Sequence, residues 1–107
     1  TGKSAKVITL DSRVEDLILD SIRQNEQGSY LAIEPSSVQK IRNSLVKLIN
    51  NLNMRGITPI VLTSPMVRIY FRKVIEDYIS FIPVLSYSEL EPGIEVQSVG
   101  MVTLNEN

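Results

Sequence analysis

The side chains that could do chemistry in this chain are hydroxyl and carboxyl groups, because its 107 residues include no His and no Cys. Without Cys there is no thiol nucleophile, thiolate metal site or disulfide framework. Without His the chain lacks the commonest general base and the commonest metal ligand near neutral pH. The composition therefore predicts a protein with no enzymatic activity, no cofactor and no metal site.

Ser64 is the best candidate for a nucleophile, because it stands where a predicted strand turns into a predicted helix. A nucleophile elbow requires the pattern G-x-S-x-G and a base that takes the proton. The residues here are Leu62-Thr63-Ser64-Pro65-Met66, with no His anywhere in the chain. Serine is also a favoured helix N-cap, and proline suits the first helical position. We therefore interpret Ser64 as a cap, and keep a hydrolase that uses Ser64 as the alternative.

Two acidic residues could belong to a ligand or Mg²⁺ site at strand ends. Asp11 follows the first predicted strand and Glu34 follows the second. They converge only if these strands are adjacent and parallel. Acidic residues at helix starts are also favoured by the helix dipole, which is the simpler interpretation. Residues 1–4, Thr-Gly-Lys-Ser, match only the end of a phosphate-binding loop, without its first glycine or its preceding strand.

A cluster of cations and apolar residues follows Ser64. Arg68, Arg72 and Lys73 are its cations, and an i,i+4 pair between Arg72 and Glu76 is expected. The segment also holds more isoleucine and phenylalanine than one helix face can bury. An apolar patch left exposed is typical of a protein–protein contact. The candidate partner-contact residues are Arg68, Arg72, Ile69, Ile79, Phe81 and Ile82.

Hydrophobic spacing predicts the elements that carry these residues. Strands are expected at 6–10, 30–33, 58–63, 83–87 and, more weakly, 94–102. Three helices are expected: one starting at Ser12, with Glu15 completing a capping box, one capped by Ser36 or Ser37, and one starting at Ser64. The prediction is an α/β fold: a small mixed β-sheet with three helices in the order βαβαβαββ, ending in a hairpin or an edge strand.

Charge and length exclude several classes of partner. Eleven Lys and Arg against twelve Asp and Glu give a net charge of −1, which does not favour a nucleic acid. The apolar runs are far shorter than the ~20 residues needed to cross a bilayer. We expect one soluble domain, residues 1–107, with flexible ends at 1–5 and 104–107 and no direct membrane contact.

Several segments together resemble a known family. The resemblance covers residues from about Val7 to Val102, and its most specific part is a strand followed by Ser-Pro, an arginine-containing helix, and Val-Leu-Ser-Tyr with an acidic residue. The chain is similar in these positions to the export-gate family of flagellar and virulence type III secretion systems, whose flagellar member is FlhA. Ser12 and Thr63 stand where members often have proline and cysteine. The residues that carry the resemblance are Ile8–Asp11, Glu15, Gly28–Glu34, Ile60–Leu62, Ser64, Pro65, Arg68, Arg72, Val84–Tyr87 and Glu89.

The resemblance implies a place and a role. The chain would be the C-terminal part of the cytoplasmic region of a bacterial inner-membrane protein that forms a ring. Its partners would be export chaperones and chaperone–substrate complexes, components of the export ATPase complex, and other subdomains and copies of the same protein. The family's chaperone groove lies in earlier subdomains, so a non-enzymatic scaffold role is implied here, with binding that requires a longer piece of the protein. The alternative is a free-standing α/β module that binds a small ligand or hydrolyses a substrate.

Overall fold

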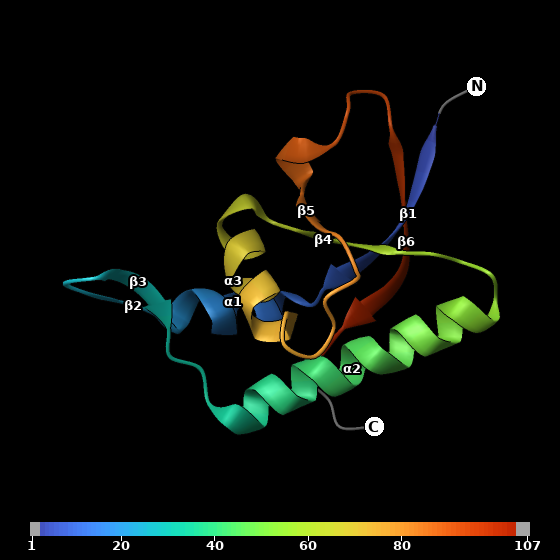
Figure 1. Cartoon of the computed structure of the whole chain (residues 1–107). Helices are drawn as coiled ribbons and strands as arrows, with labels where there is room; N and C mark the ends of the chain where they lie inside the picture. The colour runs from blue at the N-terminus through green and yellow to red at the C-terminus, as the bar shows by residue number, and fades with distance from the viewer. Residues whose placement is uncertain (1–2, 105–107) are drawn as a thin grey trace.

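Four parallel strands form the main sheet of the computed structural model, which describes residues 3–104 (Figure 1). They are β1 (Ser4–Leu10), β4 (Ile60–Thr63), β5 (Val84–Ser86) and β6 (Glu95–Val102), in the spatial order β5-β4-β1-β6. Each neighbouring pair is parallel. The last strand is therefore an edge strand paired with the first, and not the second arm of a hairpin.

Three helices connect the strands: α1 (Ser12–Asp20), α2 (Pro35–Met54) and α3 (Pro65–Ile75). A separate antiparallel hairpin of β2 (Ile22–Asn25) and β3 (Gly28–Leu31) lies between α1 and α2 and extends away from the sheet. The α/β class and the three helices are confirmed. The antiparallel pairing in the structure is confined to this hairpin, and the main sheet is parallel. The sequence predicted only one strand here, at 30–33.

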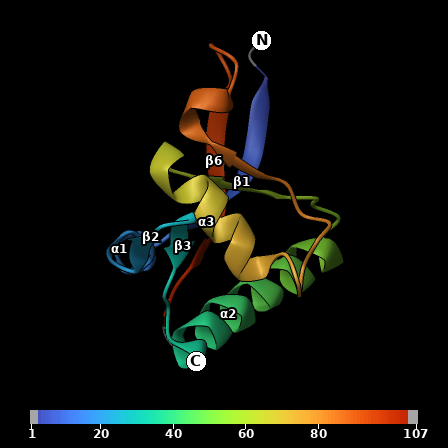
Figure 2. The same cartoon turned by 60° about the vertical axis from the view of Figure 1, so that its left-hand side comes forward.

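One buried cluster joins the helices to the sheet. Residues of α1, α2 and α3 pack together with Ile8, Leu10 and Val102 of the two strands β1 and β6. Because side chains alternate between the faces of a strand, this cluster defines the helix-bearing face of the sheet. Figure 2 shows β1 and β6 side by side, with α2 passing beneath them.

The apolar faces predicted for α2 and α3 are largely confirmed. Ile41, Leu45, Ile49 and Leu52 of α2 are buried, and so are Val67, Phe71, Val74 and Ile75 of α3. Tyr78, which was expected to continue the face of α3, lies beyond the helix and is exposed. Gly56 has φ +74, the left-handed conformation expected of a glycine that follows a helix end.

Two of the predicted helix caps are wrong, by one residue for α1 and by two or three for α2. Asp11 is the N-cap of α1, because its carboxylate accepts from the Arg13 N–H at 3.3 Å, so Ser12 is already helical. Glu34 precedes Pro35 at the start of α2, so neither Ser36 nor Ser37 is the cap. Helices thus begin directly after an acidic residue in both cases.

The predicted flexible ends lie only partly within the described residues. Residues 1–2 and 105–107 lie outside the described part of the chain. Ser4 and Ala5 already belong to β1, where they pair with β6, and Leu104 packs against the core. Strand β1 and the core contact of Leu104 thus extend into the ranges predicted to be flexible.

Candidate protein-docking surface

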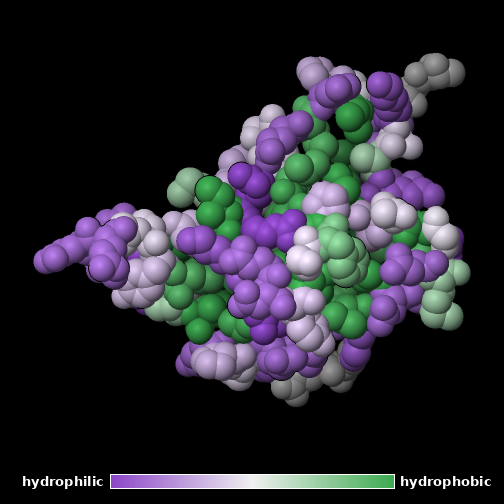
Figure 3. All heavy atoms as spheres, in the orientation of Figure 1, coloured by the Kyte–Doolittle hydropathy of each residue, from purple (hydrophilic) through white to green (hydrophobic). Residues whose placement is uncertain are grey.

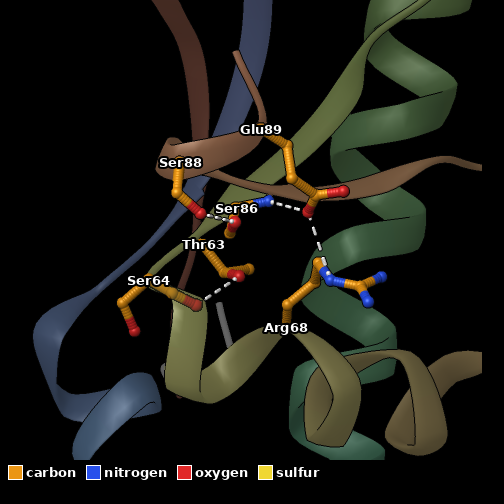
Figure 4. A network of polar contacts seen from close by, with 6 residues as sticks. All are labelled: Thr63, Ser64, Arg68, Ser86, Ser88 and Glu89. Carbon is orange, nitrogen blue, oxygen red and sulfur yellow. Dashed lines mark hydrogen bonds and ion pairs between the residues drawn. The ribbon is translucent and has the colours of Figure 1, made fainter.

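Polar side chains gather at the carboxyl ends of β4 and β5, the edge at which open α/β sheets bind ligands (Figure 4). Parallel pairing places Thr63 opposite Ser86, so the two hydroxyl groups belong to the last residues of neighbouring strands. Ser64, Ser88, Glu89 and Arg68 complete the set. This cluster is the place to test the small-ligand and hydrolase alternatives.

The hydroxyl and carboxyl groups of the cluster bind one another. Thr63 Oγ1 donates to the carbonyl of Ser64 at 2.9 Å, and the hydroxyl oxygens of Ser86 and Ser88 lie 2.8 Å apart. The Ser86 N–H donates to Glu89 Oε1 at 2.9 Å, which closes a capping box around the short helix η1 (Tyr87–Glu89). Among the described residues, no buried side-chain nitrogen or oxygen lacks a hydrogen-bond partner. These contacts give the cluster a structural role.

Glu89 is the titratable group of this cluster whose pKa is displaced. The hydrogen bond from the Ser86 N–H lowers the pKa of its carboxyl below the ordinary value. The Ser86 hydroxyl and the positive charge of Arg68 lower it further, while burial opposes them. Arg68 Nε lies 3.2 Å from Glu89 Oε1. The ion pair connects α3 to η1, so Arg68 has a partner within the chain.

Ser64 occupies the N-cap position of α3 as predicted, with Pro65 following it. Its side chain makes no capping hydrogen bond, contrary to expectation. Instead, the backbone N–H of Ser64 donates to Glu15 Oε2 of α1 at 3.0 Å. A carboxylate therefore already lies at this helix end. Among residues 3–104, no side chain accepts a hydrogen bond from the Ser64 hydroxyl.

The acidic pair Asp11 and Glu34 does not form a site. Convergence required the first two predicted strands to be neighbours in one parallel sheet. In the structure β1 pairs with β4 and β6, whereas β3, which precedes Glu34, pairs with β2 in the separate hairpin. In residues 3–104, no group of three His, Cys, Asp or Glu side chains is placed to hold a metal ion.

The six partner-contact candidates divide into exposed and buried residues. Ile69 is 54% exposed and Phe81 is 73% exposed. Ile79 and Ile82 are 4% and 2% exposed, and both belong to the core, so the expectation that they are exposed was wrong. The chain reverses direction after α3. In this segment Ile79 and Ile82 pack into the core, whereas Phe81 between them is exposed to solvent.

Arg72 holds this return segment in place. Its guanidinium donates to the carbonyl oxygens of Ile79 and Ile82. Within residues 3–104 no ion pair joins Arg72 to Glu76, so the predicted i,i+4 pair is replaced by these backbone contacts. Arg72 therefore stabilises the segment after α3, and fewer of its N–H groups remain for a partner.

Met66 is a surface residue that the sequence reasoning missed. It is 68% exposed and stands one helical turn before Ile69 on α3. The signal was present, since residues three apart share a helix face and Met66 lies opposite the buried Val67–Phe71 face. We call Met66 and Ile69 of α3, together with Phe81 of the segment that follows the helix, the α3 patch.

Comparison with known proteins identifies the family. A model described as the FHIPEP family matches residues 1–95. The chain belongs to this family. It is 44% identical over 99 residues to the flagellar biosynthesis protein FlhA of Bacillus subtilis, a match that covers 92% of this chain and 15% of that protein. The family resemblance that the sequence motifs indicated is thereby confirmed.

Solved structures of similar proteins agree with the fold. The nonameric EPEC SctV-C structure is 32% identical with a TM-score of 0.82, and the match covers 94% of this chain and 29% of that one. The Chlamydia pneumoniae CdsV protein in complex with CdsO is 37% identical with a TM-score of 0.74, over 92% of this chain and 29% of that one. The chain therefore corresponds to a minor part of its relatives. No helix in its described part is both long and apolar enough to cross a membrane.

Proposed function

We propose that this chain is a non-enzymatic docking subdomain of the protein-export gate of a flagellar or type III secretion system. It would be the C-terminal part of the gate's cytoplasmic region, beneath the bacterial inner membrane. Membership of the FHIPEP family supports the export-gate role, and the B. subtilis relative favours the flagellar branch. Its partners would be copies of the same protein in a ring, components of the export ATPase complex, and export chaperones with their substrates.

The observation that carries the docking role is the α3 patch. Met66 and Ile69 lie on α3, whose opposite face is buried, and Phe81 lies in the segment that follows the helix; each of the three side chains is more than half exposed. Figure 3 shows hydrophobic residues exposed among hydrophilic ones near the start of α3. Burying such side chains against a partner removes apolar surface from water, at about 25 cal/mol per Å². A relative solved as a nonamer and another solved with CdsO support contacts of both kinds.

The polar cluster at the strand ends supports a role without catalysis. Glu89 of this cluster pairs with Arg68, and Glu15 of α1 accepts from the backbone N–H of Ser64. The subdomain would therefore serve as a rigid wall that supports a binding groove and moves with respect to its neighbours.

A binding comparison tests this role. The isolated chain and the longer cytoplasmic region of the parent protein are each immobilised and presented with purified export chaperones loaded with substrate. We expect binding by the longer protein and little or none by the chain alone, because the α3 patch would supply only part of a docking site that upstream subdomains complete. Equal binding by the chain alone would show that the docking site lies within these 107 residues. Absence of binding by both would contradict the export-gate role.

A further inference from the structure

A hollow of about 270 Å³ lies where the β2–β3 hairpin, α2 and α3 meet. Its apolar lining comes from Leu31, Ile33, Val38 and Val74, beside the half-exposed ring of Tyr30. Its two charged lining residues are Arg42 and Lys73, and no acidic residue of the described chain lines it. An apolar floor with a cationic rim is suited to a ligand that carries an apolar group next to a negative charge.

Arg42 is held in a fixed position at this rim. Its Nε donates to the carbonyl of Val74 at 2.9 Å. That carbonyl lies in the last turn of α3, where helix carbonyls have no partner within the helix, which explains why it accepts from another element. The guanidinium carbon lies 5.7 Å from the centroid of the Tyr78 ring, so the same group also makes a cation–π contact.

The remaining donors of Arg42 fit a carboxylate. The guanidinium of Arg42 has three nitrogens. Nε donates to Val74, whereas the two terminal nitrogens have no hydrogen-bond partner among the described residues. A guanidinium offers two parallel N–H groups to a carboxylate, and a side chain already held in place loses less entropy on binding. Lys73, exposed on α3, adds a second positive charge at the rim.

We propose that this hollow binds a short acidic segment of a partner protein, with an apolar side chain in the hollow and a neighbouring carboxylate on Arg42. A free inorganic anion would satisfy Arg42 but leave the apolar lining uncovered. Charge complementarity therefore favours an acidic peptide with leucine or phenylalanine beside the acid. The hollow is separate from the α3 patch, and the proposal does not rest on the export-gate role.

The direct test is an NMR titration of the whole chain labelled with ¹⁵N. The probe is the acetylated and amidated peptide Asp-Glu-Leu-Phe-Asp. We expect amide shifts concentrated around the hollow and a dissociation constant of about 0.1–1 mM, as suits a small site. Two matched peptides, Asn-Gln-Leu-Phe-Asn and Asp-Glu-Ala-Ala-Asp, should each bind about tenfold more weakly, because each lacks one half of the recognised chemistry.

Variants of the chain separate the two halves of the site. Arg42→Gln should weaken binding about tenfold, and Arg42→Lys, which keeps the charge without the fork, about threefold. Val38→Phe fills the hollow without removing a cation and should also weaken binding about tenfold. Arg13→Gln, an exposed arginine on α1, is the matched control and should bind as the wild type does.

Three results would overturn the proposal. One is unchanged binding by both Arg42→Gln and Val38→Phe. Another is equal binding of the alanine peptide, which would mean that charge alone attracts the probe. The third is a set of amide shifts spread over cations remote from the hollow. Arg42→Lys and Val38→Phe keep the test decisive even if Arg42→Gln does not fold.

Discussion

The carboxylate of Glu15 accepts a hydrogen bond from the backbone N–H of Ser64, at 3.0 Å and across 49 residues of sequence. Glu15 belongs to α1, and Ser64 precedes α3, so the bond ties the first helix to the start of the third. A negative charge at a helix N-terminus is stabilising, and the contact is half-buried. The turn at Ser64, which was a candidate site for a nucleophile, thus connects α1 to α3.

Removing this hydrogen bond should destabilise the fold. Glu15→Ala is expected to lower the free energy of unfolding by about 1 kcal/mol, the usual cost of losing a helix cap. Equilibrium unfolding in urea measures it. Asp16→Ala, an exposed acid on the same helix, is the matched control and should change the value by less than about 0.5 kcal/mol. Equal effects of the two changes would mean that the Glu15–Ser64 bond contributes nothing.

The buried face of α2 makes a stronger prediction. Leu45 is 0% exposed in the core, so Leu45→Ala should lower the free energy of unfolding by roughly 2–5 kcal/mol. Asn50→Ala, on the exposed side of the same helix, should have little effect. A loss below about 1 kcal/mol for Leu45→Ala would mean that this face does not pack as described.

The contact between α2 and the edge strand β6 depends on Gly100. A Cβ added there would lie 2.7 Å from Leu48 Cδ2, too close for an unchanged packing. Gly100→Ala should therefore lower the free energy of unfolding by about 1 kcal/mol, since the end of a leucine side chain can move aside. Combined with Leu48→Ala, the same change should cost less than it does alone. Strictly additive losses in urea unfolding would contradict this close approach.

The ion pair of Glu89 and Arg68 predicts a pH dependence. The pKa of Glu89 is lowered from 4.5 in the folded chain, chiefly by the Ser86 N–H, so the folded state prefers the ionised carboxylate. Its contribution to stability is present above the unfolded value and is lost as the pH falls through the folded one. NMR titration of the Glu89 carboxyl should give a higher pKa in Arg68→Ala than in the wild type. The rise should be modest, because the Ser86 N–H, which lowers this pKa more than Arg68 does, is still present in that variant. An unchanged pKa in Arg68→Ala would show that the pair does not act in solution.

Arg68→Ala should leave folding nearly unchanged, because surface ion pairs contribute about 0–1 kcal/mol and both side chains are more than a third exposed. The urea midpoint measures this. A large loss of stability would show that Arg68 is a structural residue and not a surface one.

Helix positions could be predicted from the sequence because they depend on local spacing. The three- and four-residue steps of Ile41, Leu45 and Ile49 identify the face of α2 without knowledge of the rest of the fold. The Ser64-Pro65 start of α3 is equally local. The hairpin was missed because Ile22 continues the apolar spacing of α1, while the residues after it in β2 are polar and exposed.

Tertiary placement could not be predicted from such spacing. Ile79 and Ile82 look like surplus apolar residues until the chain is seen to fold back beneath α3, held by Arg72. Strand order is also invisible locally: β6 pairs with β1 although more than 80 residues separate their partners, as Val7 and Ser98 show. The hollow beside Arg42 arises from three separate elements, so no single segment predicts it.

The measurement that tests the proposed docking role most directly compares variants of the α3 patch in a longer form of the protein that is extended upstream of this chain. Biolayer interferometry would measure its affinity for purified export-ATPase components and loaded chaperones. The double variant Ile69→Asp with Phe81→Asp should bind at least one of these partners about tenfold more weakly, while Met54→Asp, at a still more exposed apolar site on α2, should bind as the wild type does. If the double variant folds and binds every partner with unchanged affinity, the α3 patch is not a docking surface.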